Sequence, residues 1–292
     1  MVEHIFCRDI CIERGEPLAG AGSAAKRYIL LHWPRAHWRV PRTQSHTMPV
    51  ELADAIMTAN AAGLHVALVD GDDIALSCDN INITQIEPQK AAQLIYELAD
   101  GAKLEGEKDN RITIVCCTDA KQDPCCARYG FATWKALKAQ ADPQHFRILQ
   151  STHLGGCRFA ASVIVLPQRA RYSRLQPENI ANFLEHIKKG TPYLPAYRGN
   201  PELDALSQVA EHAALTWAQE KGLHGNVSFP HPIIEPHDGT SIIIDTVIGS
   251  YVLEISLRKT SFPVNTRCVT LKDESDPTQI MRWIAVNIRV KI

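Results

Sequence analysis

Five of the nine cysteines in this chain lie between positions 116 and 157, as does His153, and these side chains are the most reactive candidates in the sequence. Two adjacent pairs, Cys116-Cys117 and Cys125-Cys126, come first, and His153 and Cys157 follow in a second segment. Thiolate and imidazole groups are preferred ligands of iron–sulfur clusters and of zinc. The spacing therefore indicates a metal centre, and the residue types leave iron and zinc both open.

The loop between His153 and Cys157 contains the dipeptide Gly155-Gly156. Glycine takes positive φ angles without steric cost and lets the backbone approach a ligand closely. Successive backbone N–H groups in such a loop can also face an anionic group. We expect this loop to fold tightly around whatever the cysteines hold.

The cysteine pattern does not suit a disulfide framework, because the number is odd and four residues form adjacent pairs. The first twelve residues carry Glu3, Arg8 and Asp9 and do not resemble a secretory signal, which predicts a cytoplasmic protein. Outside the central window, Cys78 and Cys268 are expected to be small buried hydrophobic residues, and Cys7 and Cys11 structural thiols.

The charges are balanced, with 31 lysines and arginines against 32 aspartates and glutamates, so nothing favours nucleic acid as a partner. Apolar runs are far shorter than the roughly 20 residues of a membrane helix, and no membrane association is predicted.

The elements expected around the cysteines occur in the order strand, helix, strand, strand, helix, which is what a thioredoxin-like layer of sheet and helices would give. The predicted ranges are Arg111 to Cys116, Ala127 to Ala141, His145 to Gln150, Phe159 to Leu166 and Pro177 to Lys188. Residues 107–198 are therefore predicted to form one α/β domain.

The flanking regions are also predicted to combine helices and strands. Residues 1–106 are predicted to form an N-terminal α/β region, which ends in a polar linker, Glu105 to Asn110. Residues 199–292 read as a C-terminal α+β module with a long helix, Pro201 to Lys221, and several strands, one of them Arg267 to Leu271.

Several motifs resemble those of the sucrase/ferredoxin-like family, whose members are thioredoxin-like [2Fe–2S] ferredoxins. The resemblance rests on Cys117-Thr-Asp, Asp123, Cys125-Cys126-Ala, His153-Leu-Gly-Gly and Arg158-Phe-Ala, and on Cys7 and the run Arg14 to Gly20. It implies that Cys117, Cys126, His153 and Cys157 ligate one [2Fe–2S] cluster. The commoner family loop carries a second histidine where this chain has Cys157. Replacing one thiolate by a neutral imidazole predicts an intermediate reduction potential and proton coupling at a single site.

The resemblance implies an electron carrier rather than an enzyme, with a reductase or an electron acceptor as its redox partner and a homodimer left open. Two alternatives remain at this stage: a structural zinc-binding domain with the same four ligands, and a thiol-disulfide redox protein on the same fold.

Arg158 is a candidate donor to the cluster, or else an ordinary surface charge. Arg169, Arg171 and Lys188-Lys189 are candidates for a basic docking face.

Overall fold

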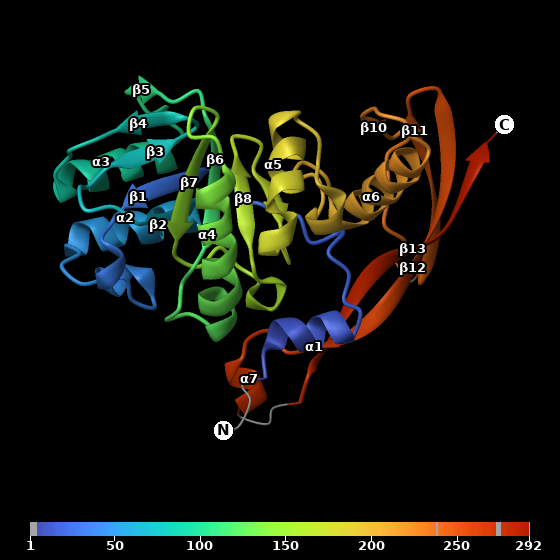
Figure 1. Ribbon diagram of the computed structural model, residues 1–292, viewed down its shortest axis with the longest axis horizontal. Helices are drawn as coiled ribbons and strands as arrows, with labels where there is room; N and C mark the ends of the chain where they lie inside the picture. The colour runs from blue at the N-terminus through green and yellow to red at the C-terminus, as the bar shows by residue number, and fades with distance from the viewer. Residues whose placement is uncertain (1–4, 238, 273–275, 292) are drawn as a thin grey trace.

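The computed structural model describes residues 5–237, 239–272 and 276–291, which form a nine-stranded mixed sheet and a separate four-stranded antiparallel sheet (Figure 1). The strand order of the large sheet is β5-β4-β3-β1-β2-β7-β6-β8-β9. This arrangement confirms the predicted mixed α/β class with a C-terminal α+β module.

The part of the large sheet that carries the cysteines has the predicted thioredoxin-like order. Strand β6 pairs in parallel with β7 and antiparallel with β8, which in turn pairs antiparallel with β9. The elements are β6 (Ile112–Cys117), α4 (Phe131–Gln140), β7 (Phe146–Ser151), β8 (Val163–Leu166), β9 (Ala170–Tyr172) and α5 (Ile180–Lys188). The predicted strand from Phe159 thus begins only at Val163, because a short 3-10 turn, Cys157–Phe159, comes first.

The N-terminal region repeats this arrangement. Strand β1 pairs in parallel with β2 and antiparallel with β3, and β3 pairs antiparallel with β4. The elements are β1 (Tyr28–His32), α2 (Val50–Ala61), β2 (His65–Val69), β3 (Leu76–Cys78), β4 (Ile81–Ile83) and α3 (Pro88–Ala99). The predicted linker contributes a two-residue edge strand, β5 (Glu107–Lys108). The large sheet therefore consists of two thioredoxin-like units.

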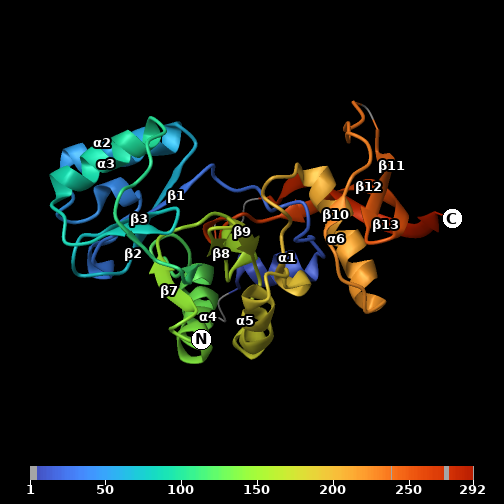
Figure 2. The same ribbon diagram turned by 90° about the horizontal axis from the view of Figure 1, so that it is seen from above.

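The two units meet edge to edge at β2 and β7, which run antiparallel with Val69 opposite Ser151. In Figure 2, α2 and α3 lie on one face of the sheet, and α4 and α5 lie on the other. Strand β6 ends at Cys117, and β1, its counterpart in the first unit, ends at His32. Of the two units, only the second carries cysteines at these strand ends.

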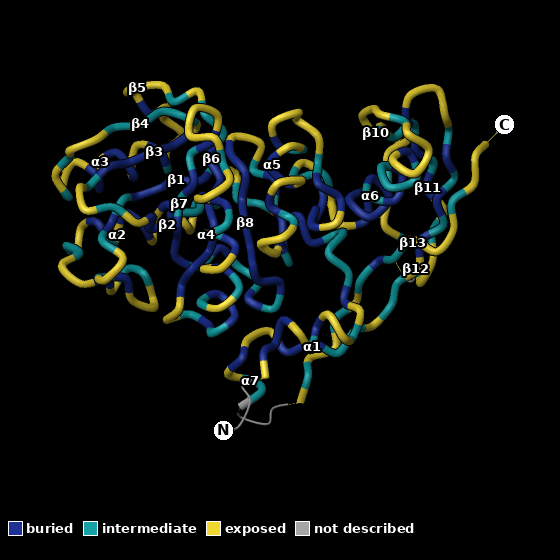
Figure 3. Tube along the Cα trace, viewed as in Figure 1, coloured by how far each residue is buried: buried dark blue, intermediate teal, exposed yellow. Residues whose placement is uncertain are grey.

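The central strands are buried on both faces, which explains their continuous apolar sequences (Figure 3). In β6, Ile114 and Cys116 pack in the core under α4 and α5, whereas Val115 and Cys117 pack in a separate cluster on the opposite face. The alternation of a strand thus separates the two adjacent cysteines.

The C-terminal module consists of helix α6 packed on an antiparallel sheet. Asp204 caps α6 (Ala205–Glu220) by accepting the backbone N–H of Ser207 at 2.9 Å. The strands are β10 (Val227–Ser228), β11 (Ser241–Ile248), β12 (Tyr251–Val264) and β13 (Thr278–Lys291). The predicted strand from Arg267 to Leu271 is wrong, since a short helix, α7 (Val269–Lys272), follows Cys268.

The N-terminal helix α1 (Cys7–Glu13) does not pack within the N-terminal region. It contacts β12 and the turn that follows Cys157, and it lies near α7 below the large sheet (Figure 1). Helix α1 and helix α7, far apart in the sequence, thus lie side by side beneath the large sheet. The predicted domain boundaries, 1–106, 107–198 and 199–292, stay predictions.

Candidate metal centre

The four predicted ligands come together at the ends of β6 and β7. Ligand atoms of Cys117, Cys126 and His153 all lie within 4.8 Å of one another. Cys157 extends the group, with its Sγ 3.8 Å from Nδ1 of His153. Cys117, Cys126 and Cys157 are buried, and His153 is partly buried. Three thiols and one imidazole, drawn from separate loops, are a donor set that fits a [2Fe–2S] cluster and also zinc.

The members of each adjacent cysteine pair point to different places. The Sγ of Cys116 lies 3.4 Å from the carbonyl oxygen of Gly130, in the core under α4. Cys125 turns away from Cys126, and its Sγ lies 3.5 Å from that of Cys7. Only one member of each pair therefore faces the candidate centre.

A single π-helical turn, Cys126–Gly130, positions Cys126. Such turns recur at functional sites because they redirect side chains within a helix. The turn packs directly on the end of β6: a Cβ atom at Gly130 would lie 2.0 Å from the carbonyl oxygen of Cys117. Glycine at this position therefore brings the turn that carries Cys126 close to Cys117.

The second loop is held by its glycines and by the neighbouring unit. Gly155 and Gly156 have φ angles of 92° and 76°, the left-handed region that the sequence predicted for them. Just before His153, the backbone N–H of Thr152 donates to the carbonyl of Leu68 at 2.8 Å. The Thr152 hydroxyl accepts the N–H of Leu68 at 3.0 Å. The N-terminal unit thereby fixes the start of the loop that carries two of the predicted ligands.

Asp119 connects the two ligand loops. Its Oδ2 accepts the backbone N–H of His153 at 3.2 Å, and its Oδ1 accepts the N–H groups of Lys121 and Gln122. The side chain is buried, and burial raises its pKa. One carboxylate thus sets the separation between the segment after β6 and the segment after β7.

The donor side chains influence one another's protonation. Interaction with Cys126 lowers the pKa of Cys117 and lowers that of Cys157 to about 6. Burial alone would lower the pKa of His153, but the neighbouring Cys117 and Cys157 thiolates outweigh it and raise the pKa to about 9. The pKa of Cys126 is raised, because its protonated thiol hydrogen-bonds to the sulfurs of Cys117 and Cys157. Deprotonated thiols are the form that metals bind.

Two guanidinium groups flank the second loop. Arg42 Nη2 donates to the carbonyl of His153 at 2.8 Å, and Arg171 Nη2 donates to that of Leu154 at 2.6 Å. Burial lowers the pKa of both arginines, and the nearby Cys117 thiolate opposes this shift, so both guanidinium groups lie within electrostatic range of it. An anionic centre formed by three thiolates would gain from these two positive charges.

A cleft of about 430 Å³ opens beside His153. Arg39, Arg42, Met57 and Asp119 contribute to its walls, and His153 is the predicted ligand that lines it. The histidine is thus the part of the centre closest to this opening.

The surroundings of Arg42 predict an acid sensitivity. Arg42 Nη1 lies 3.2 Å from Nε2 of His65, and burial, together with Arg42, lowers the pKa of His65 to about 3. An unfolded histidine titrates near 6.5, so between about pH 6.5 and 3 the unfolded state binds more protons. The contribution of neutral His65 to the free energy of unfolding should be complete above about pH 6.5. It should fall by roughly 1 kcal/mol per pH unit as the pH is lowered through this range.

Denaturant unfolding of wild type and His65→Gln at several pH values measures this effect. The variant should lose less stability on acidification. A matched control is His145→Gln, since His145 is exposed and pairs with Asp142 on the surface. Equal acid sensitivity of wild type and His65→Gln would contradict the role given to His65.

Two predictions about arginines are corrected. Arg158 is neither a donor to the centre nor a surface charge: it forms a two-pronged ion pair with the buried Glu16 at 2.8 and 2.9 Å. The basic docking face is wrong for Arg169 and Arg171. Arg169 pairs with Glu202, and Arg171 donates to backbone carbonyls.

A second group of cysteines was missed by the sequence reasoning. Cys7, Asp123, Cys125 and Cys268 are all buried, and their ligand atoms lie within 4.8 Å of one another. Cys268 was expected to be a hydrophobic residue and Cys7 a structural thiol. The adjacency of Cys125 and Cys126 was the available signal, because two neighbouring side chains point in different directions and can reach two different centres.

Comparisons with known proteins identify relatives of the central part of the chain. A family model described as sucrase/ferredoxin-like matches residues 18–199, more than half of the chain. Among solved structures, a thioredoxin-like [2Fe–2S] ferredoxin from Aquifex aeolicus matches with 23% identity and a TM-score of 0.28, covering 30% of this chain and 91% of that one. A second structure of the wild-type Aquifex aeolicus protein matches with 21% identity and a TM-score of 0.27, covering 30% and 97%. No curated protein matches.

Among the described residues, no helix has the length and apolar character needed to cross a membrane.

Proposed function

Because the chain belongs to the sucrase/ferredoxin-like family, we propose that it is an electron-transfer protein that carries one [2Fe–2S] cluster on Cys117, Cys126, His153 and Cys157. The observation that carries the proposal is the convergence of these four side chains, from two loops, into one largely buried group. When bound, such a cluster supplies one-electron redox chemistry.

The chain's own residues provide what this chemistry needs. Asp119 and Thr152 hold the two loops in register, so the ligands need little rearrangement on gaining or losing an electron. Arg42 and Arg171 offset the negative charge of three thiolates. Burial of the sulfur ligands keeps water away from them.

The cleft beside His153 suggests where electrons enter and leave. Electron transfer is fastest over the shortest path, and His153 is the ligand at the opening. We propose that the redox partner, a reductase or an electron acceptor, docks over this cleft. Arg39 and Arg42 in its wall favour an acidic surface on that partner.

The two alternatives make different predictions about metal and colour. Zinc on the same ligands gives a colourless protein, and a thiol-disulfide protein gives one without a stoichiometric metal at these residues. Anaerobic purification followed by iron and sulfide analysis and visible spectroscopy separates the three. Two irons and two sulfides per chain, with visible absorption that dithionite bleaches, are the expected result.

The mixed ligand set predicts how the potential responds to ligand exchange. His153→Cys adds a thiolate, so the reduction potential should fall by on the order of 100 mV and become less dependent on pH, because the imidazole is gone. Cys157→His removes a thiolate and should have the opposite effect. Voltammetry of both variants between about pH 6 and 9 measures this.

His186→Cys is a suitable control, because His186 is a partly exposed helix residue that lies outside the two loops of the candidate centre. It should leave potential and pH dependence at the wild-type values. If His153→Cys assembles a cluster with unchanged potential and pH dependence, His153 is not a ligand.

A further inference from the structure

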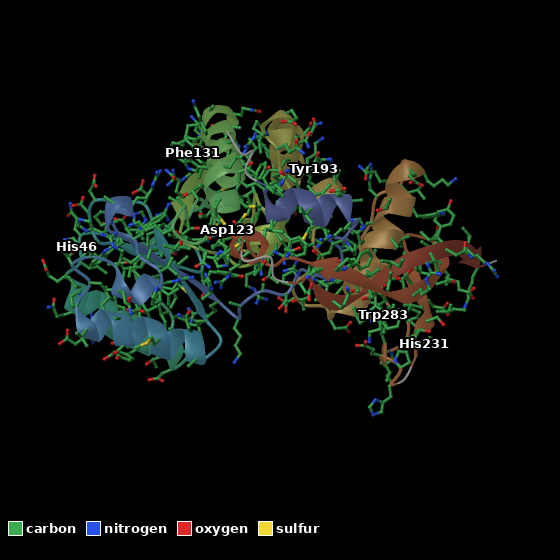
Figure 4. All side chains as sticks on the ribbon, turned by 90° about the horizontal axis from the view of Figure 1, so that it is seen from below. His46, Asp123, Phe131, Tyr193, His231 and Trp283 are labelled. Atoms are coloured by element: carbon green, nitrogen blue, oxygen red, sulfur yellow. The ribbon has the colours of Figure 1, made fainter. Side chains whose placement is uncertain are left out.

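We propose that Cys7, Cys125, Cys268 and Asp123 form a second, structural metal site that binds one Zn²⁺ ion. The site is separate from the proposed cluster ligands, and it joins helix α1 and the residue before α7 to the loop that carries Cys126. In Figure 4, Asp123 lies beside sulfur atoms and the short C-terminal helix α7.

The sulfur geometry is that of a metal site. The three sulfur atoms form a triangle with sides of 3.3 Å (Cys125 to Cys268), 3.5 Å (Cys7 to Cys125) and 3.7 Å (Cys7 to Cys268). Three thiolates at about 2.3 Å from a tetrahedral zinc ion lie about 3.8 Å apart. The observed sulfur–sulfur distances are slightly shorter than this, because without an ion the three thiols contact one another. A zinc ion would therefore need only a slight outward shift of each sulfur.

Asp123 completes the donor set. Its Oδ1 accepts the backbone N–H of Cys125 and its Oδ2 that of Cys268, each at 2.8 Å. A carboxylate oxygen has two lone pairs, so one remains on each oxygen for a cation. The carboxylate therefore orients two of the cysteines through their backbones and supplies the fourth ligand itself.

Burial argues for an occupant that carries positive charge. Cys7, Cys125, Cys268 and Asp123 are each at most 2% exposed. Burying three thiols and a carboxyl group away from water costs free energy, which hydrophobic side chains at the same positions would not cost. A divalent cation turns the same set into a closed site, and the three thiols release their protons to solvent as it binds.

The position of the site explains what it would do. Cys7 begins helix α1, Cys125 precedes the turn that carries Cys126, and Cys268 precedes α7. Cys7 and Cys268 are separated by 261 positions. A bound ion would close this long loop and hold the turn that carries Cys126 in place through the neighbouring residue Cys125.

Metal analysis of the full chain, purified without chelators, tests the proposal. We expect one zinc per chain in addition to the iron, and a zinc X-ray absorption spectrum with three sulfurs at about 2.3 Å. The zinc affinity of Cys268→Ser, measured by competition with a chelator, should be more than about 100-fold lower than that of the wild type. Cys268→His, which keeps a zinc-binding side chain, should retain zinc with two sulfurs instead of three.

Cys11→Ser is the matched control, since Cys11 is buried on the same helix and its Sγ lies 3.9 Å from the carbonyl of Asn265, outside the group. It should keep the zinc. A wild-type protein without zinc, a disulfide between Cys125 and Cys268, or zinc that is lost in Cys126→Ser and kept in Cys268→Ser would overturn the proposal. Zinc at this site in a protein without iron would refute the proposed function and leave this inference standing.

Discussion

Cys125→Ser and Cys126→Ser are expected to lose different metals, although the two residues are adjacent. Cys126→Ser removes a thiolate from the group with Cys117 and His153, and it should retain less than about a tenth of the wild-type iron while keeping its zinc. Cys125→Ser removes a thiolate from the group with Cys7 and Cys268. It should lose zinc and keep its visible spectrum.

Cys116 and Cys117 provide a second matched pair. Cys117→Ser should abolish the visible absorption, whereas Cys116→Ser should leave it intact, because Cys116 lies in the core under α4. Iron and zinc contents of all four variants, with visible spectra, measure the pattern. If Cys125→Ser and Cys116→Ser lose the iron and their neighbours keep it, the wrong member of each pair has been assigned.

Gly130→Ala is expected to disrupt the cluster loop. An added methyl group would lie 2.0 Å from the carbonyl oxygen of Cys117, and that carbonyl belongs to a strand held by neighbours on both sides. Alanine gains about 1 kcal/mol over glycine in a helical position, but overpacking against fixed backbone costs more. We expect a net destabilisation of at least about 2 kcal/mol and impaired cluster retention.

Gly225→Ala is the control for this prediction. The nearest atoms to its added methyl group would lie 3.5 Å away, an ordinary contact distance. Denaturant unfolding and iron content of both variants measure the effect. A Gly130→Ala protein with wild-type stability and iron content would show that the turn does not need to approach Cys117 this closely.

Local patterns in the sequence were sufficient for the elements around the cysteines. Apolar runs ended by glycine, proline or polar residues predicted β6 and β7 to within about one residue and the end of α5 at Lys188, while a 3-10 turn occupies the first residues predicted for that helix. Strand alternation separates Cys116 from Cys117, and Gly155-Gly156 predicted positive φ angles. These features depend on neighbouring residues, so the sequence alone determines them. The choice of Cys117, Cys126, His153 and Cys157 came from family resemblance, and metal analysis remains its test.

Tertiary structure decided every feature that depends on residues distant in sequence. The duplication of the thioredoxin-like unit follows from strand pairing, since the two halves share an order of elements without a repeated motif. Arg158 finds its partner in Glu16, 142 positions away. Cys268 seemed isolated in the sequence, yet it lies 3.3 Å from Cys125. Such contacts arise only when the chain folds and brings distant segments together, because no local preference encodes a partner more than a hundred residues away.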